Sequence, residues 1–132
     1  MSLFVVFDTN VIVSSMLSNN PNASTVKVVE AISQGKAIPL YNDEILVEYR
    51  EVLRRTRFNL QPSIVNSMIA SIIRLGVRVD RTQTDETFVD LSDLVFYEVA
   101  LSKEGSFVVT GNTKHFPKSP IVVTPTELLA ML

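Results

Sequence analysis

The hydrophobic and polar positions of this chain fall into short blocks, each with the length and period of one strand or one helix. Residues 3–7 are five consecutive large apolar side chains, and residues 106–110 form a second apolar stretch. Runs without alternation are typical of strands that are covered on both faces of a parallel sheet. Shorter apolar stretches at residues 37–41 and 121–123 predict two more strands, and the alternating residues 77–80 predict a fifth.

Segments with helical spacing of apolar residues lie between these strands. Residues 43–58, for example, carry an apolar stripe from Ile45 to Leu53. Gly35 and Gly76 directly follow two of the periodic segments and are typical helix stops. The alternation of strands and helices, without internal repeats or low-complexity tracts, predicts a parallel α/β sandwich. The expected helices occupy residues 11–17, 23–34, 43–58, 63–75, 90–103 and 126–132.

Asp8 is the first charged side chain after the leading apolar run, and its position allows two roles. It stands at the carboxyl end of the first predicted strand, and that edge of an open parallel sheet is where ligands bind. The same aspartate could instead cap the helix that follows. Sequence position alone favours neither role over the other.

The charges are distributed unevenly along the chain. The net charge is −2, from 12 basic and 14 acidic residues, so no global basic field indicates a nucleic-acid partner. Four arginines nevertheless fall within eight residues, at Arg50, Arg54, Arg55 and Arg57. These arginines either pair with glutamates of the same helix on a solvated face, or follow a phosphate backbone.

Size and composition predict one domain over residues 1–132. A hydrophobic fraction of 46% allows a sizeable core without metals or disulfides. The absence of cysteine excludes disulfides, zinc–thiolate sites and a cysteine nucleophile, and is compatible with a reducing cytoplasm. No window approaches the roughly 18 apolar residues that span a bilayer, and Asp8 interrupts the leading run too early for a secretory signal. We therefore expect a cytoplasmic protein without membrane contact.

Three carboxylates are expected at one edge of the sheet. Asp8 ends a strand, Glu48 borders the buried stripe of one helix, and Asp93 lies in the first turn of another. Taken alone, Asp93 is better explained by its favourable position at a helix start. Clustered carboxylates, however, repel each other unless a cation lies between them. The cation that suits oxygen ligands is Mg²⁺ or Mn²⁺, which would activate water to hydrolyse a phosphodiester.

Three polar residues follow the apolar strand 106–110. Asn112 is either a turn former after Gly111 or a group that orients a water molecule beside Asp8. His115 is the only histidine, and its loop position before a proline indicates a structural or surface residue. Lys114 could contact a phosphate, although an exposed lysine needs no role.

Four short segments, taken in order, make the chain resemble a PIN domain. The similarity covers nearly the whole chain, and the order and spacing of the segments are more specific than any one of them. The ending also resembles that of a bacterial branch of toxins. The segments are Phe7-Asp8-Thr9-Asn10-Val11, Glu48-Tyr49 with Val52-Leu53 and Arg55, Asp90-x-x-Asp93, and Val109-Thr110-Gly111-Asn112 with Lys114-His115-Phe116-Pro117; the ending is Val123-Thr124-Pro125-x-Glu127-Leu128-Leu129.

The resemblance implies a three-layer α/β/α sandwich around a mainly parallel five-stranded sheet of order 3-2-1-4-5. It also implies an endoribonuclease that uses Mg²⁺ or Mn²⁺ to hydrolyse single-stranded RNA, with a VapC-like toxin role, an antitoxin partner and a homodimer. Asp8, Glu48 and Asp93 match the acidic metal-binding residues, and Asn112 completes the candidate catalytic set where many members have a fourth acid. Further substrate contacts are expected from Asn10, Thr110, Lys114, Arg54 and Arg55.

This chain departs from the family pattern at Asn112 and at Leu94, where a second adjacent aspartate is frequent. We therefore expect one firmly held metal ion and a second that binds only with RNA.

Two other interpretations remain open. A PIN-like fold that has lost hydrolysis with its fourth acid would only bind RNA or a protein partner. A phosphoacceptor receiver domain has a similar size, and Asp80 and Lys114 could serve as its phosphoacceptor and its late lysine. A receiver normally has an acidic pair after its first strand, however, whereas Asp8 is followed by Thr9 and Asn10.

Overall fold

The strands form one parallel sheet in a computed structural model that describes residues 2–88 and 90–132. Among these residues, five strands pair in the order β3-β2-β1-β4-β5, and every pair is parallel. The predicted order 3-2-1-4-5 is therefore confirmed. The strands are β1 (Leu3–Phe7), β2 (Ala37–Tyr41), β3 (Val77–Arg78), β4 (Phe107–Val109) and β5 (Val122–Val123).

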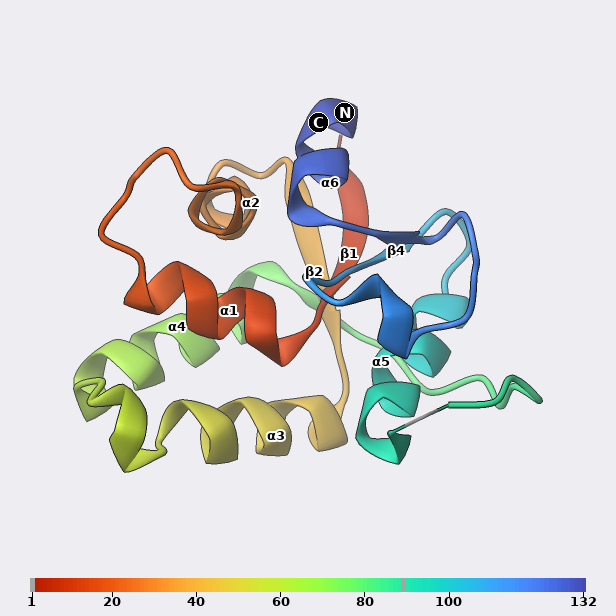
Figure 1. The fold of residues 1–132 in the computed structure, drawn as a ribbon, viewed down its shortest axis with the longest axis horizontal. Coiled ribbons are helices and arrows are strands. Elements are labelled where there is room, and N and C mark those ends of the chain that lie inside the picture. The colour runs from red at the N-terminus through yellow and green to blue at the C-terminus, as the bar shows by residue number, and fades with distance from the viewer. Residues whose placement is uncertain (1, 89) are drawn as a thin grey trace.

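Helices cover the sheet on both faces and give the expected α/β/α sandwich. Figure 1 shows α1 to α4 on one side of the strands and α5 on the other, as right-handed crossovers require. The last helix, α6, packs against α2. The helices of the described residues are α1 (Thr9–Leu17), α2 (Ser24–Ser33), α3 (Asp43–Leu53), α4 (Pro62–Leu75), α5 (Leu91–Leu101) and α6 (Pro125–Met131), with short 3-10 helices η1 (Thr56–Phe58) and η2 (Thr113–His115).

The central strand β1 explains the apolar run at the start of the chain. It lies between β2 and β4, with Leu3 opposite Ala37 and Val5 opposite Phe107. Its last three residues, including Val6 and Phe7, are fully buried, because helices lie over both faces of the sheet. The run therefore ends at Asp8 in the middle of the sheet, where the chain turns directly into α1.

The predicted helix over residues 43–58 was wrong at its C-terminal end. The helix α3 stops at Leu53, and a separate 3-10 turn, η1, follows before Asn59, whose φ is 51°. A continued helix would place Arg50, Arg54 and Arg57 one above the other, and like charges at this spacing are unfavourable. The break instead turns the segment after Leu53 back toward the carboxyl edge of the sheet.

The strand β3 is two residues long, whereas four were predicted. Its pairing ends because its neighbour β2 ends at Tyr41, whose carbonyl accepts the last hydrogen bond, from the Val79 amide, at 2.9 Å. Just before β3, the backbone of Gly76 packs tightly on Pro39 of β2. A Cβ atom at Gly76 would lie 2.4 Å from the Pro39 carbonyl oxygen, so only glycine fits here.

The strand order also distinguishes between the folds considered for this chain. A receiver domain has the flavodoxin-like order 2-1-3-4-5, in which the third strand lies next to the first. Here β2 and β4 flank β1, which rules out the receiver interpretation. None of the helices within the described residues has the length and apolar character needed to cross a membrane.

Candidate active site

Asp8 lies at the carboxyl end of β1, almost fully buried with 5% of its surface exposed. Asp8 is the N-cap residue of α1, as one of the two predicted roles requires, but its side chain makes no capping hydrogen bond there. The Oδ2 atom instead accepts a hydrogen bond from the Thr110 hydroxyl at 2.7 Å, across the β1–β4 pair. Burial raises the pKa of Asp8, and the Thr110 hydrogen bond opposes part of that rise. Burial thus makes the negative charge of Asp8 costly in the free protein.

Glu48 reaches the same edge from α3. The neighbouring Tyr49 is buried, and its hydroxyl donates to the Phe7 carbonyl, which fixes α3 against the end of β1. Glu48 Oε2 then accepts a hydrogen bond from the Thr9 hydroxyl at 2.5 Å. Burial raises the pKa of Glu48, and the negative charge of Asp8 adds to this effect.

Asp93 comes from the first turn of α5, on the other face of the sheet. The N-cap of this helix is Asp90, whose Oδ1 accepts from the Ser92 amide at 2.9 Å, so the carboxylate of Asp93 is not used for capping. Its Oδ2 atom is buried and has no hydrogen-bond partner among the described residues. Burial, followed by the negative charges of Asp8 and Asp90, raises the pKa of Asp93 to about 6.

His115 was expected to be structural or on the surface, but it faces Asp93 from η2. Its Nδ1 atom lies 3.5 Å from Asp93 Oδ2, and its Nε2 atom lies 3.0 Å from the side-chain amide nitrogen of Asn112. Since an amide nitrogen only donates, Nε2 accepts, and the proton of a neutral ring is then on Nδ1. Asn112 therefore reaches the acidic group through His115.

These side chains border one cleft of about 280 Å³ at the carboxyl edge of the sheet. Of the predicted site residues, Asp8, Glu48, Asp93, Asn10 and Arg55 line it. Sequence reasoning assigned no role in the site to Thr9, His115, Asp90 or Phe58, and it offered contact with a phosphate backbone as one of two alternatives for Arg57. The cleft is lined by Asp8, Thr9, Asn10, Glu48, Val52, Arg55, Arg57, Phe58, Asp90, Ser92, Asp93 and His115.

The other predicted residues lie behind or beside this cleft. Thr110 is fully buried, and its hydroxyl supports Asp8 instead of facing substrate. Lys114 lines a different hollow, on the β5 side of η2. Arg54 points toward α4, where it donates to Asn66 Oδ1 at 3.2 Å. Asn112 contributes no lining surface and contacts the cleft residue His115.

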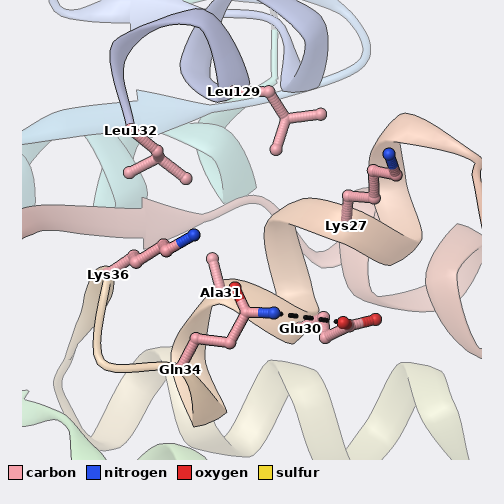
Figure 2. A pocket seen from close by; sticks show the side chains of 7 residues that line it. All are labelled: Lys27, Glu30, Ala31, Gln34, Lys36, Leu129 and Leu132. Carbon is pink, nitrogen blue, oxygen red and sulfur yellow. Dashed lines mark hydrogen bonds between the residues drawn. The ribbon is translucent and has the colours of Figure 1, made fainter.

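A hollow of about 310 Å³ elsewhere on the surface has a different character (Figure 2). It lies between α2 and α6, and Lys27 and Lys36 enter it from α2 and from the turn before β2. Its one carboxylate belongs to Glu30, which accepts a hydrogen bond from Gln34 at 3.2 Å. Without clustered acids, this hollow does not resemble a cation site, and the chemistry of the molecule is concentrated in the acidic cleft.

The acidic cleft offers carboxylate oxygens of the kind that bind a divalent metal ion, although these side chains do not surround a single point. Within the described residues, no three acidic, histidine or cysteine side chains lie close enough to hold an ion as they stand. Asp8 and Glu48 are held by Thr110 and Thr9, while Asp93 Oδ2 is buried without a partner. Oxygen atoms of this kind, one of them unsatisfied, are ligands that Mg²⁺ and Mn²⁺ prefer.

The raised pKa of Asp93 predicts that the metal-free protein loses stability as the pH rises. The pKa is about 6 in the folded state and 3.8 when unperturbed, so the folded state holds this proton more tightly. The stabilisation is complete below pH 3.8 and is lost as the pH passes through about 6. A pKa difference of this size corresponds to about 3 kcal/mol in the free energy of unfolding for a buried group. Because Asp93 lines an open cleft, screening lowers the expected change to about 1 kcal/mol.

Urea unfolding in EDTA between pH 4 and pH 7.5 measures this change, with Asp93→Asn as the control variant. Asp8, Glu48, Asp90 and His115 face the same cleft, so the informative quantity is the difference between the two proteins. We expect the free energy of unfolding to fall more steeply for the wild type. Parallel pH profiles of the two proteins would contradict the prediction.

A family model described as PIN domain matches residues 4–114, which is 111 of the 132 residues. No curated protein matches the chain.

Proposed function

Because this chain belongs to the PIN domain family, whose members are generally nucleases, we propose that its acidic cleft hydrolyses phosphodiester bonds of single-stranded RNA with Mg²⁺ or Mn²⁺. The observation that carries the proposal is the convergence of Asp8, Glu48 and Asp93 on one cleft from β1, α3 and α5. Packing has buried these carboxylates at a cost, because burial raises the pKa of each of the three, and neighbouring negative charges raise it further at Glu48 and Asp93. Sites that tolerate such a cost are candidates for function.

The three carboxylates are the residues that would hold the cation. When bound, it would provide Lewis-acid activation of water and positive charge against the phosphodiester. Asp93 Oδ2 offers a free buried oxygen for this purpose, and the Thr110 hydroxyl keeps the Asp8 carboxylate in place. Asn112 and His115 add a hydrogen-bonded arm beside Asp93, at the position where many family members have a fourth acid.

Cleavage of a mixed pool of single-stranded RNA by the purified protein tests this proposal. The reaction is run with Mg²⁺, with Mn²⁺ and with EDTA, and the products are separated by length. We expect cutting with either metal ion and none in EDTA. Cleavage that persists in EDTA would contradict metal dependence, and absence of cleavage with every metal ion would contradict the nuclease proposal. In the second case, RNA binding without cleavage would identify a PIN-like binding module.

We also propose that the protein acts as a VapC-like toxin with an antitoxin partner and forms a homodimer in the cytoplasm. The ending from Val123 to Leu129 supports the toxin role through its resemblance. An apolar groove of about 360 Å³ between α2 and α4, with Ile64 51% exposed, supports a partner surface.

Growth arrest on expression, with rescue by a co-expressed partner, tests the toxin role. Light scattering over a range of protein concentrations tests the dimer.

A further inference from the structure

The acidic cleft needs a positively charged side chain at its border if it is to bind a polyanion such as RNA. Four carboxylates line it, and each would repel a phosphate that approaches without a bridging cation. Two exposed arginines, Arg55 and Arg57, line the rim of the same cleft, in the segment between α3 and α4. The question is which of these two guanidinium groups is available to a ligand.

Arg55 is already paired. Its Nη2 atom lies 3.1 Å from both carboxylate oxygens of Glu51, one helical turn earlier. Arg57, by contrast, makes no salt bridge within the part of the chain that the structure describes, and its side chain is exposed. Of the two rim arginines, Arg57 therefore has the uncompensated charge.

The guanidinium of Arg57 is also held in a defined place. Its Cζ atom lies 4.8 Å from the centroid of the Phe58 ring, a cation–π contact. Phe58 is half-buried, packs against the core and lines the cleft itself. A stacked guanidinium keeps its in-plane N–H groups free and loses less side-chain entropy on binding than a freely rotating one.

The backbone fixes this arrangement from below. In η1 the Phe58 amide donates to the Arg55 carbonyl, and the Asn59 amide donates to the Thr56 carbonyl, both at 3.0 Å. Asn59 then adopts a left-handed conformation with φ 51°, which asparagine tolerates better than most residues. The turn thus places Arg57 and Phe58 side by side at the rim.

We infer that Arg57, stacked on Phe58, forms a binding subsite for a phosphate of single-stranded RNA. This phosphate would lie next to the phosphodiester that is hydrolysed at the carboxylates. This inference rests on the proposed nuclease function and adds to it the residue that binds the strand. The planar N–H fork of Arg57 suits two oxygens of one phosphate. Phe58 acts as a positioning residue, because it holds the guanidinium in that orientation.

The test measures RNA binding by the Asp8→Asn protein with Mg²⁺ at several salt concentrations, before and after adding Arg57→Gln. Loss of one phosphate contact should weaken binding about 5- to 10-fold at low salt. It should also reduce the slope of log affinity against log salt by about 0.7. The matched control is Arg74→Gln, which removes the same charge from an exposed position on α4 that does not line the cleft.

Cleavage kinetics of the otherwise unchanged protein test the role of Phe58. We expect Phe58→Leu to raise KM several-fold with kcat nearly unchanged, since the strand is held less well while the carboxylates are intact. Phe58→Tyr retains the aromatic face, so its KM should stay close to that of the wild type. A purely structural role for the ring would lower the amount of active protein instead, and kcat would fall with KM unchanged.

The outcomes separate this inference from the proposed function. If the wild type cleaves RNA and Arg57→Gln binds as tightly as Arg74→Gln, with the same salt slope, the subsite is wrong and the nuclease proposal stands. If the wild type neither cleaves nor binds RNA, the proposed function fails and the subsite fails with it. A specific loss of affinity and of salt slope in Arg57→Gln supports the subsite.

Discussion

Replacing Asp8 with asparagine should reduce RNA cleavage by about 100-fold or more and leave the fold intact. The carboxylate is one of three that would hold the cation, and loss of one charge-stabilising group in an active site typically has an effect of this size. The asparagine amide oxygen can still accept the hydrogen bond from the Thr110 hydroxyl. Because the buried charge of Asp8 has a raised pKa, its removal should not lower the free energy of unfolding.

The measurement combines cleavage rates at saturating metal ion with thermal unfolding in EDTA. Asp85→Asn is the matched control, since it makes the same chemical change at an exposed loop residue outside the cleft. We expect the control to keep the wild-type rate. Cleavage by Asp8→Asn within a few-fold of that rate would show that the chemistry does not depend on this edge of the sheet.

Replacing Arg81 with alanine should destabilise the protein by about 3 kcal/mol, because it leaves a buried carboxylate without its partner. Glu98 of α5 has only 6% of its side chain exposed. Its Oε1 atom accepts a hydrogen bond from Arg81 Nε at 2.8 Å and lies 2.6 Å from Arg81 Nη2. Its other oxygen accepts from the Thr84 amide at 2.9 Å. The Arg81 contact to Glu44 is largely exposed and contributes little to this loss.

Urea unfolding of Arg81→Ala and of Arg78→Ala tests this prediction. Arg78 pairs with Asp43 at an exposed site, so its loss should cost less than about 1 kcal/mol. A double variant, Arg81→Met with Glu98→Leu, should recover much of the stability, since it removes the buried charge as well as its partner. Equal losses in the two single variants would contradict a special role for the buried pair.

This pair also has a consequence for the active site. It ties the segment between β3 and α5 to the helix α5, together with the Thr82 amide, which donates to the Glu98 carbonyl at 3.1 Å. The same segment leads into Asp90 and Asp93. Arg81 contacts both Glu98 of α5, the helix that carries Asp93, and Glu44 of α3, the helix that carries Glu48.

Local pattern was sufficient to predict the fold class and part of the candidate site. The unbroken run before Asp8 identified the central strand, because only a strand covered on both faces is apolar at every position. Glu48 was identified from the helical spacing of apolar residues, because it lies at the border of the apolar stripe. The full strand order came from family resemblance, since alternation alone does not distinguish 3-2-1-4-5 from the receiver order.

Other features depended on contacts between distant parts of the chain, which no local pattern encodes. Thr110 donates to Asp8 across 102 residues of sequence, and Thr9 donates to Glu48 across 39. His115 belongs to one of the segments that carry the resemblance, but no role in the site followed from its sequence position, because a lone histidine in a loop acquires its role only from the neighbour that folding brings to it.

The sequence by itself determined which segments are strands, which carboxylates are expected at the carboxyl edge of the sheet, and the family to which the chain is similar. These features follow from the period of apolar residues and the order of short motifs. Only the tertiary structure decided that Arg55 pairs with Glu51, while Arg57 lies over Phe58 without a salt bridge to any residue that the structure describes. The physical reason is that charge compensation, burial and pKa depend on distances through space, and these are set when β1, α3, α5 and η1 pack around one edge of the sheet.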